Sequence, residues 1–221
     1  MSAVPDHVRR MFVLLVGILG VYILIVGFGD KTLFEGLRVL LLSLVLIGAL
    51  RVRRRAGRST LAAAVLTGIA ITGVLLTAAL GATQVFNLIV SVEEAVLVAV
   101  TMVVLGRMIW ERRQILESGT VLGVLCIYLL LGLLFGDLHQ IGAAFDPQYL
   151  NGVDGRANSS DCLYLSVITL TTVGFGDVTP ATNYGRSVAI TEAIVGQLYL
   201  VSVVAAAVGG WRAAHQPPGR P

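Results

Sequence analysis

Long runs without a charged residue dominate the pattern of this chain. Residues 11–28, 118–136 and 193–211 contain no Asp, Glu, Lys or Arg. Each run is about as long as the roughly 20 apolar residues that a helix needs to cross a hydrocarbon core of about 30 Å. The hydrophobic fraction of 56% and the mean hydropathy of +0.87 exclude an ordinary soluble fold. We therefore predict an all-α membrane protein.

Breaks in the apolar pattern predict three more helices. Residues 59–92 contain no charge, and one helix of that length would be about 51 Å long at 1.5 Å per residue, too long for a single pass. The polar cluster at residues 81–84 divides this run in two. A helix is also expected over residues 33–50, although Glu35 and Arg38 lie in its first turns. The predicted spans are then six transmembrane helices, at residues 11–28, 33–50, 60–80, 85–107, 118–138 and 184–208.

The basic residues support this count. With six spans and a cytoplasmic amino terminus, 12 of the 16 basic residues fall on the cytoplasmic side. Because such an excess sets orientation, we expect a multi-pass protein of the cell membrane with both termini in the cytoplasm. The arginines of residues 51–55 fit an anchor beside anionic lipid, and no nucleic-acid partner is expected. The twelve are Arg9, Arg10, Arg51, Arg53, Arg54, Arg55, Arg58, Arg107, Arg112, Arg113, Arg212 and Arg220.

The segment from Thr171 to Asp177 reads Thr-Thr-Val-Gly-Phe-Gly-Asp and lies between two apolar runs. Lipid cannot satisfy free backbone carbonyls, so an irregular segment at this depth must face protein or water. Glycine reaches left-handed backbone angles at little steric cost. Alternating glycines with β-branched or aromatic residues therefore lets successive peptide oxygens point the same way. A ring of such oxygens can replace the hydration shell of a potassium ion.

This segment resembles the selectivity filter of the potassium-channel family, with Phe175 where the common sequence has Tyr. The resemblance covers about the last hundred residues. It implies an all-α fold in which a re-entrant pore helix and filter lie between helices five and six. It also implies two domains: an amino-terminal bundle of four transmembrane helices, residues 1–113, and a pore domain, residues 114–221. The pore domain would comprise an outer helix at 118–138, a pore helix at 161–171, the filter at 172–177 and an inner helix at 184–208.

The resemblance also implies roles for single residues. Potassium would be coordinated by the carbonyls of four filter residues, namely Thr172, Val173, Gly174 and Phe175, with the Thr172 hydroxyl completing the innermost site. Gly176 and Asp177 would complete the filter, with Asp177 at its outer mouth. On the inner helix, Gly196 would be a hinge, and the cavity would be lined by Gln197, Leu200 and Val204. Potassium would be the permeant ion, and no cofactor is expected. One filter per chain implies a homotetramer in the lipid bilayer, and a separate regulatory subunit is left open.

Two positions depart from the family pattern. Leu165 stands where many members have a Trp that bonds the filter Tyr, and Ile168 stands where some have a Glu bridged to the filter Asp. Because Phe175 also lacks a hydroxyl, we expect packing more than hydrogen bonding to hold this filter. Glu192 is an ionisable residue in an apolar helix, and we place it behind the filter. There it must find a partner or stay protonated.

The four amino-terminal helices lack the pattern of a voltage sensor. A sensor needs regularly spaced arginines in its fourth helix, whereas residues 85–107 hold Glu93 and Glu94 and no basic residue before Arg107. Arg38 and these glutamates fall at similar predicted depths. We therefore expect Arg38 to pair with Glu93 or Glu94. The alternative is that both glutamates line a wet crevice or a subunit contact.

Catalysis is not expected, because the sequence shows no cluster of metal ligands and no nucleophile–base motif. His7, His139 and His215 are scattered near predicted membrane edges. Cys126 and Cys162 fall at different depths, which argues against a disulfide. Two alternatives to a potassium channel stay open: a potassium transporter or ion-dependent sensor, and a non-selective cation channel with a relaxed filter.

Overall fold

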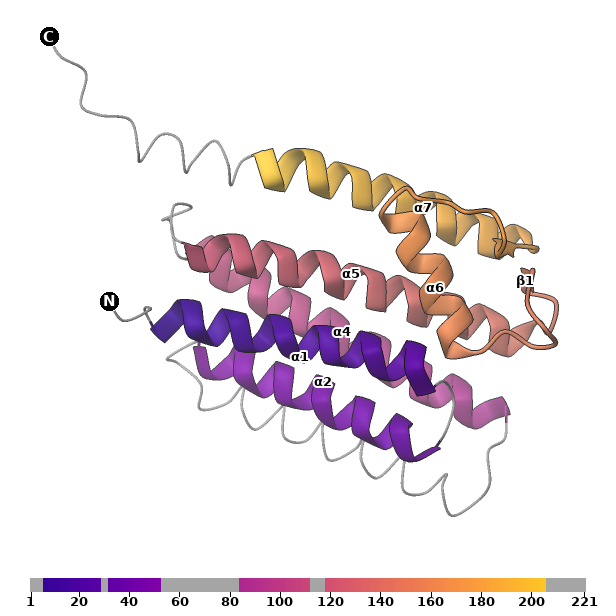
Figure 1. Cartoon of the computed structure of the whole chain (residues 1–221), viewed down its shortest axis with the longest axis horizontal. Coiled ribbons are helices and arrows are strands. Elements are labelled where there is room, and N and C mark those ends of the chain that lie inside the picture. Colours follow the sequence, from indigo (N-terminus) through magenta and orange to yellow (C-terminus); the bar gives the residue numbers. More distant parts are fainter. Residues whose placement is uncertain (1–5, 29–31, 53–83, 112–117, 206–221) are drawn as a thin grey trace, which may run out of the picture.

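A computed structural model describes residues 6–28, 32–52, 84–111 and 118–205 of the chain (Figure 1). Helices dominate this part of the chain, and the two short strands pair with each other. The helices are α1 (Asp6–Phe28), α2 (Thr32–Val52), α4 (Gln84–Glu111), α5 (Ser118–Phe145), α6 (Ser159–Leu170) and α7 (Asn183–Tyr199). After α7 the chain continues as one turn of π-helix, η1 (Leu200–Val204), and the strands are β1 (Leu150–Asn151) and β2 (Thr179–Pro180).

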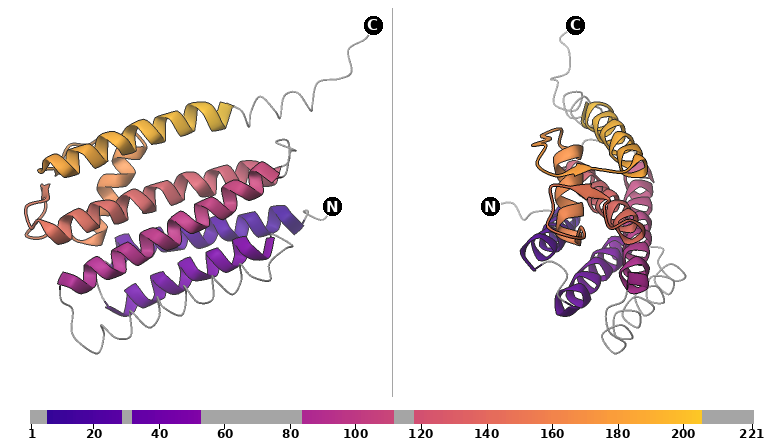
Figure 2. Two further views of the ribbon diagram at one scale, coloured as in Figure 1. Left: turned by 180° about the vertical axis from the view of Figure 1, so that it is seen from behind. Right: turned by 90° about the vertical axis from the view of Figure 1, so that its right-hand side faces the viewer.

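Helix α5 is the centre of the arrangement, because α1, α4, α6 and α7 all pack against it. The long helices run side by side, and the short α6 lies obliquely between α5 and α7 (Figures 1 and 2). One apolar core joins the amino-terminal helices to α5. Its fully buried side chains include Ile18, Leu46, Leu97, Leu105 and Leu130.

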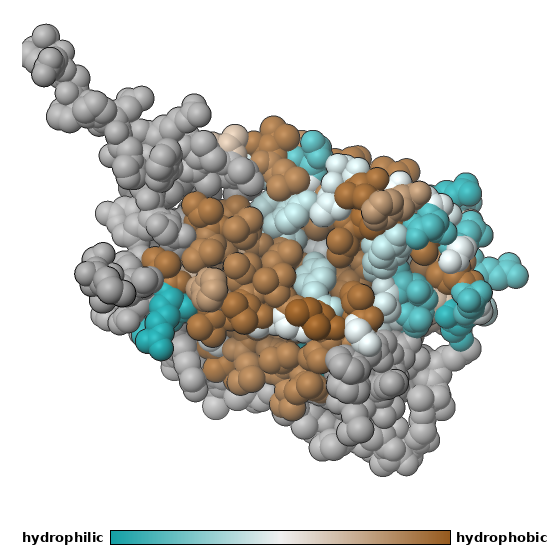
Figure 3. All heavy atoms as spheres, in the orientation of Figure 1, coloured by the Kyte–Doolittle hydropathy of each residue, from teal (hydrophilic) through white to brown (hydrophobic). Residues whose placement is uncertain are grey.

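Three helices in the described part of the chain are long and apolar enough to cross a membrane. They are Val8–Gly27, Leu88–Ile109 and Val121–Phe145, while Leu37–Leu50 and Ser159–Leu170 are shorter apolar helices. Hydrophobic side chains cover the flank of the helices in Figure 3, and polar ones gather at the end where β1 lies. This distribution fits a protein whose helices stand in lipid and whose β1 end stands in water.

Most predicted helices occur with shifted ends. Residues 85–107 fall within α4, and α5 runs seven residues beyond the predicted end at 138. The predicted helix at 60–80 lies outside the described residues, so the count of six spans stays a prediction. The inner helix begins at Asn183 because the Thr182 side chain caps it, accepting from the backbone N–H of Gly185.

The start of the pore helix was predicted two residues late. Helix α6 begins at Ser159 rather than at Asp161, because Asn158 is its cap. The Asn158 side chain accepts the Asp161 N–H at 3.0 Å, and the Asp161 carboxylate accepts the Asn158 N–H at 3.0 Å. This reciprocal capping box satisfies two N–H groups that a helix start otherwise leaves free.

Candidate functional site

The predicted filter follows directly from the carboxyl end of α6, where Thr171 is the C-cap. Its backbone alternates in handedness: Thr172, Gly174 and Gly176 have positive φ angles of 59°, 51° and 81°, whereas Val173 and Phe175 do not. Positive φ is rare for a residue other than glycine, and it is costly for a β-branched residue such as Thr172. The strained conformation of Thr172 therefore marks a backbone that the surrounding structure enforces.

Three filter amides are turned toward the end of α6. The N–H of Thr172 donates to the Thr169 carbonyl at 3.0 Å, and the N–H groups of Val173 and Gly174 donate to the Ile168 carbonyl at 2.9 and 3.0 Å. In a trans peptide the N–H and the C=O point in opposite directions. The carbonyls of Thr171, Thr172 and Val173 are therefore directed away from α6, toward one side.

The predicted filter is exposed in a single chain. Residues 171–177 are all exposed, and Val173 and Phe175 keep 53% and 71% of their surfaces accessible. One apolar stripe that runs from α7 into η1 is exposed as well, and its members are Ile190, Ile194, Leu198 and Val201. Apolar surface that stays exposed over adjacent elements is typical of a contact surface.

A hydrogen bond also holds the outer mouth of the predicted filter, and the expectation that packing contributes more than hydrogen bonding stays a prediction. The Tyr164 hydroxyl donates to the Asp177 carboxylate at 2.8 Å. This hydrogen bond holds the pKa of Asp177 below its usual range, because a donor stabilises the charged form. Sequence analysis missed Tyr164, although an aromatic hydroxyl near the outer end of the pore helix was a usable signal. Leu165 and Ile168, as expected, are buried apolar side chains.

The polar loop before α6 packs against the segment after the filter. Strand β1 pairs antiparallel with β2, matching Leu150 with Pro180, and the Ala181 N–H donates to the Tyr149 carbonyl at 2.9 Å. Gly152 has a φ of +82°, and a Cβ at this position would collide with the Asp177 carbonyl oxygen. Only glycine allows this close approach, so the loop and the filter mouth form one unit.

The inner helix contacts the end of the pore helix at Gly196. A Cβ at Gly196 would lie 2.6 Å from Leu170 Cδ1 and 3.2 Å from the Leu170 carbonyl oxygen, so close packing explains this glycine. Helix α7 runs through Gly196, and the winding changes at Leu200, where η1 begins. Gln197 is exposed and Leu200 is half-buried. The side chain of Val204 lies outside the described residues.

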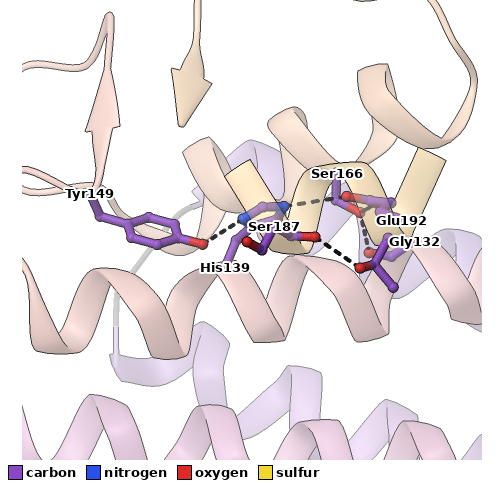
Figure 4. A network of polar contacts seen from close by, with 7 residues as sticks. Gly132, His139, Tyr149, Ser166, Ser187 and Glu192 are labelled. Carbon is purple, nitrogen blue, oxygen red and sulfur yellow. Dashed lines mark hydrogen bonds and ion pairs between the residues drawn. The ribbon is translucent and has the colours of Figure 1, made fainter. Parts of the chain in front are cut away.

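A buried polar network lies behind the pore helix (Figure 4). Glu192 of α7 is fully buried, with one carboxylate oxygen 2.5 Å from Ser166 Oγ and the other 3.3 Å from His139 Nε2. His139 Nδ1 lies 2.8 Å from the Tyr149 hydroxyl, and Ser166 donates to the Gly132 carbonyl at 2.7 Å. The sequence predicted that Glu192 would either find a partner or stay protonated, and it does have hydrogen-bond partners.

The position of His139 near a membrane edge stays a prediction. Within the protein, this side chain of α5 is fully buried and meets Glu192 of α7. No local pattern marks it, since its partners Tyr149 and Glu192 lie 10 and 53 residues away. Only the crossing of α5, α6 and α7 brings these groups together.

In the amino-terminal bundle, Arg38 of α2 faces Glu94 of α4. The Arg38 Nε lies 2.6 Å from Glu94 Oε1, and both side chains are more than nine-tenths buried. Of the two glutamates considered, Glu94 is therefore the one that meets Arg38, while the neighbouring Glu93 is half-buried. This ion pair joins α2 to α4 inside the apolar core.

Other chemistry is not visible in the described part of the chain. No group of three or more His, Cys, Asp or Glu side chains there is arranged to hold a metal ion. Cys126 and Cys162 are both buried, and no disulfide joins them. The filter, its hydrogen-bonded mouth and the buried network therefore make up the candidate site.

Comparison with known proteins agrees with this location of the site. Residues 123–209 match a family model described as ion channel. Two curated proteins, both called Protein LctB, are similar over shorter segments. The one from Bacillus caldotenax is 49% identical over 51 residues, which is 23% of this chain and 37% of that protein. The one from Geobacillus stearothermophilus is 41% identical over 61 residues, 27% of this chain and 45% of that protein.

The matched segment thus spans about two fifths of the length of these curated relatives. No solved structure matches the chain. Residues 123–209 are thus similar to ion-channel domains, and this similarity and the long apolar helices together support a membrane protein.

Proposed function

We propose that this protein is a subunit of a potassium-selective channel that conducts K⁺ passively as a homotetramer. The observation that carries the proposal is the backbone of the filter. Its amides are tied to α6 and its φ angles alternate in sign, so that carbonyl oxygens are directed to one side. Fixed carbonyl oxygens are the ligands with which channels replace the water around K⁺.

Four copies are needed because one chain supplies only one edge of such a ring. Closed cyclic assemblies are the usual way to repeat a surface around an axis. The exposed side chains of Val173 and Phe175 and the apolar stripe of α7 would then face neighbouring copies or the central cavity. Gln197, Leu200 and Val204 would line that cavity, with Gly196 holding the inner helix against the pore helix.

The electrostatics of the site favour a cation. The carboxyl end of α6 would point toward the central cavity, where the helix dipole presents partial negative charge. At the other end of the filter, Asp177 stays ionised because Tyr164 donates to it. With both termini in the cytoplasm, as the distribution of arginines predicts, Asp177 would face the outside of the cell membrane.

Voltage is not the proposed stimulus. Within α4 the only basic residue is Arg107, near the end of the helix, and the buried Arg38 is already matched by Glu94. Moving a charge through the membrane potential supplies about 2.3 kcal/mol per 100 mV, so a bundle without an arginine ladder gains little from voltage. Lipid, pH or a separate regulatory subunit would set the open probability.

Bi-ionic reversal potentials of the purified full-length protein in liposomes test the proposal. A potassium channel gives a reversal potential close to that of K⁺ when Na⁺ is the opposing ion. A non-selective channel gives a value near zero, and a transporter shows no current without a coupled substrate. Either of the last two results would refute the proposal.

Thr172→Ala sharpens the test. The variant removes the hydroxyl proposed for the innermost site, and we expect lower K⁺ over Na⁺ selectivity with the oligomer intact. Alanine is less strained than a β-branched residue at a φ of 59°, so backbone strain would not explain a loss. Ser43→Ala, in α2 and far from the filter, is the control, since the Ser43 hydroxyl has no hydrogen-bond partner among the described residues.

A further inference from the structure

The buried network behind the pore helix contains too many acceptors for its hydrogens if Glu192 is ionised. Ser166 Oγ lies 2.5 Å from Glu192 Oε1 and 2.7 Å from the Gly132 carbonyl oxygen. Both distances are those of O–H···O hydrogen bonds. Ser166 has one hydroxyl hydrogen, and a carbonyl or a carboxylate can only accept. If Glu192 were ionised, one of these two oxygen–oxygen contacts would contain no hydrogen and would not be a hydrogen bond.

A proton on Glu192 Oε1 resolves this shortage. Glu192 then donates to Ser166, and Ser166 donates to Gly132. On the other side, the Tyr149 hydroxyl donates to His139 Nδ1 at 2.8 Å, and the His139 Nε2–H donates to Glu192 Oε2 at 3.3 Å. Each hydrogen is used once, and every contact of the network is satisfied.

The alternative pair, a carboxylate with a charged imidazolium, has the same number of protons but fits less well. His139 would then donate from both nitrogens, and the buried Tyr149 hydroxyl would need another acceptor. Ser166 would turn to the carboxylate, and the 2.7 Å contact with Gly132 would lose its hydrogen. Unsatisfied buried polar groups are expensive, so the neutral pair is favoured.

We infer that Glu192 is a protonated positioning residue that, through the hydrogen-bond chain Tyr149–His139–Glu192–Ser166–Gly132, fixes the pore helix and the filter between the outer and inner helices (Figure 4). This inference rests on the proposed channel function. It assigns to the network the task of holding the filter carbonyls in place.

Both ends of this hydrogen-bond network are linked to residues that hold the filter. Ser166 lies on α6 two residues before Ile168, whose carbonyl accepts the amides of Val173 and Gly174. At the other end, the backbone of Tyr149 accepts from Ala181 just beyond β2. A loss of the network would therefore loosen the pore helix and the outer mouth together.

Few other titratable groups face Glu192. They are His139 and Tyr128 of α5, Tyr22 of α1 and Tyr149 before β1. A tyrosine is neutral at physiological pH because its ordinary pKa is about 10. Asp137 interacts electrostatically with Glu94 and Arg38 and also with Tyr22. With His139 neutral, Glu192 carries the proton that a rise in pH would remove first.

Infrared difference spectroscopy of the full-length protein tests the proton directly and does not depend on conduction. At neutral pH, wild type minus Glu192→Gln should show the C=O stretch of a protonated carboxyl group. Ser166→Ala should shift this band, because it removes the hydrogen bond to the Glu192 carboxyl. Carboxylate bands alone in the difference spectrum would overturn the inference, whatever ion the protein conducts.

Conduction tests the positioning role. Glutamine keeps one donor toward Ser166 and one acceptor toward His139, so Glu192→Gln should keep K⁺ over Na⁺ selectivity at neutral pH. It should also keep selectivity at alkaline pH, where the wild type loses it. Ser166→Ala should lower the selectivity ratio about fivefold at neutral pH, the factor that one net hydrogen bond represents.

Two matched variants complete the experiment. Ser187→Ala removes a hydroxyl that bonds only the Asn183 carbonyl of its own helix, and Glu93→Gln removes a half-buried carboxylate of α4. In both variants, K⁺ over Na⁺ selectivity should depend on pH as it does in the wild type. The same pH profile in Glu192→Gln and wild type would refute the positioning role. If the wild type lacked K⁺ selectivity, the proposed function would be refuted. The infrared spectrum would still decide whether Glu192 is protonated.

Discussion

The buried Arg38–Glu94 pair offers the sharpest energetic prediction. Arg38→Met keeps most of the apolar stem of the side chain but removes the guanidinium that lies 2.6 Å from Glu94 Oε1. Both side chains are more than nine-tenths buried, so water cannot replace the lost partner. Removing one member of such a pair typically costs about 3–5 kcal/mol. We expect the free energy of unfolding to fall by that amount.

The double variant Arg38→Met/Glu94→Gln separates the ion pair from simple packing. Replacing both charges of a buried pair is often nearly neutral, so the double variant should be more stable than Arg38→Met by about 2 kcal/mol or more. Equilibrium unfolding in mixed micelles, followed by circular dichroism, gives the free energy of unfolding of the four proteins in this double-mutant cycle. They are the wild type, Arg38→Met, Glu94→Gln and the double variant. Glu93→Gln, at the half-buried neighbouring position, should change stability by less than about 1 kcal/mol.

A coupling energy near zero would refute this reasoning. If Glu94→Gln changed the free energy of unfolding by the same amount in the wild type and in Arg38→Met, the two side chains would not be stabilising each other. The amino-terminal bundle would then owe its stability to apolar packing alone.

Two further predictions concern the filter. Tyr164→Phe removes the hydrogen bond that holds the pKa of Asp177 below its usual range. Because the carboxylate of the wild type protonates only at unusually low pH, loss of current on acidification should begin at a higher pH in Tyr164→Phe, and an unchanged acid profile would contradict this. Gly196→Ala places a Cβ 2.6 Å from Leu170 Cδ1, and overpacking of this kind costs about 1–3 kcal/mol. We expect lower K⁺ flux and a less stable assembly, and wild-type values of both would show that the helices separate freely there.

The helices and the filter were predictable because their signals are local. Charge-free runs locate α1 and α5 from composition alone, since lipid disfavours charge at any position along a span. The filter is also local: alternating glycines set a backbone that α6 then fixes through the carbonyl of Ile168. Even the meeting of Arg38 with a glutamate followed from depth along two helices, although depth did not decide between Glu93 and Glu94.

The partners of the filter could not be predicted in the same way. The Tyr164–Asp177 hydrogen bond joins residues 13 apart in different local structures, and the Ser166–Glu192 bond joins residues 26 apart. Single polar residues in apolar helices look alike in sequence, whether they meet a partner or their own backbone. Which one they meet depends on how α5, α6 and α7 cross.

The turn of π-helix at Leu200–Val204 changes which side chains of the inner helix share a face on its two sides. A π-turn takes in one residue more than an α-helical turn, and one residue corresponds to a rotation of about 100°. Any position assigned by counting α-helical turns downward from Gln197 is therefore displaced around the helix once Leu200 is passed. The cavity position of Val204 follows from the family resemblance, and the π-turn separates it from Gln197. Mutational scans of this region will therefore follow a broken periodicity whose phase shifts within these five residues.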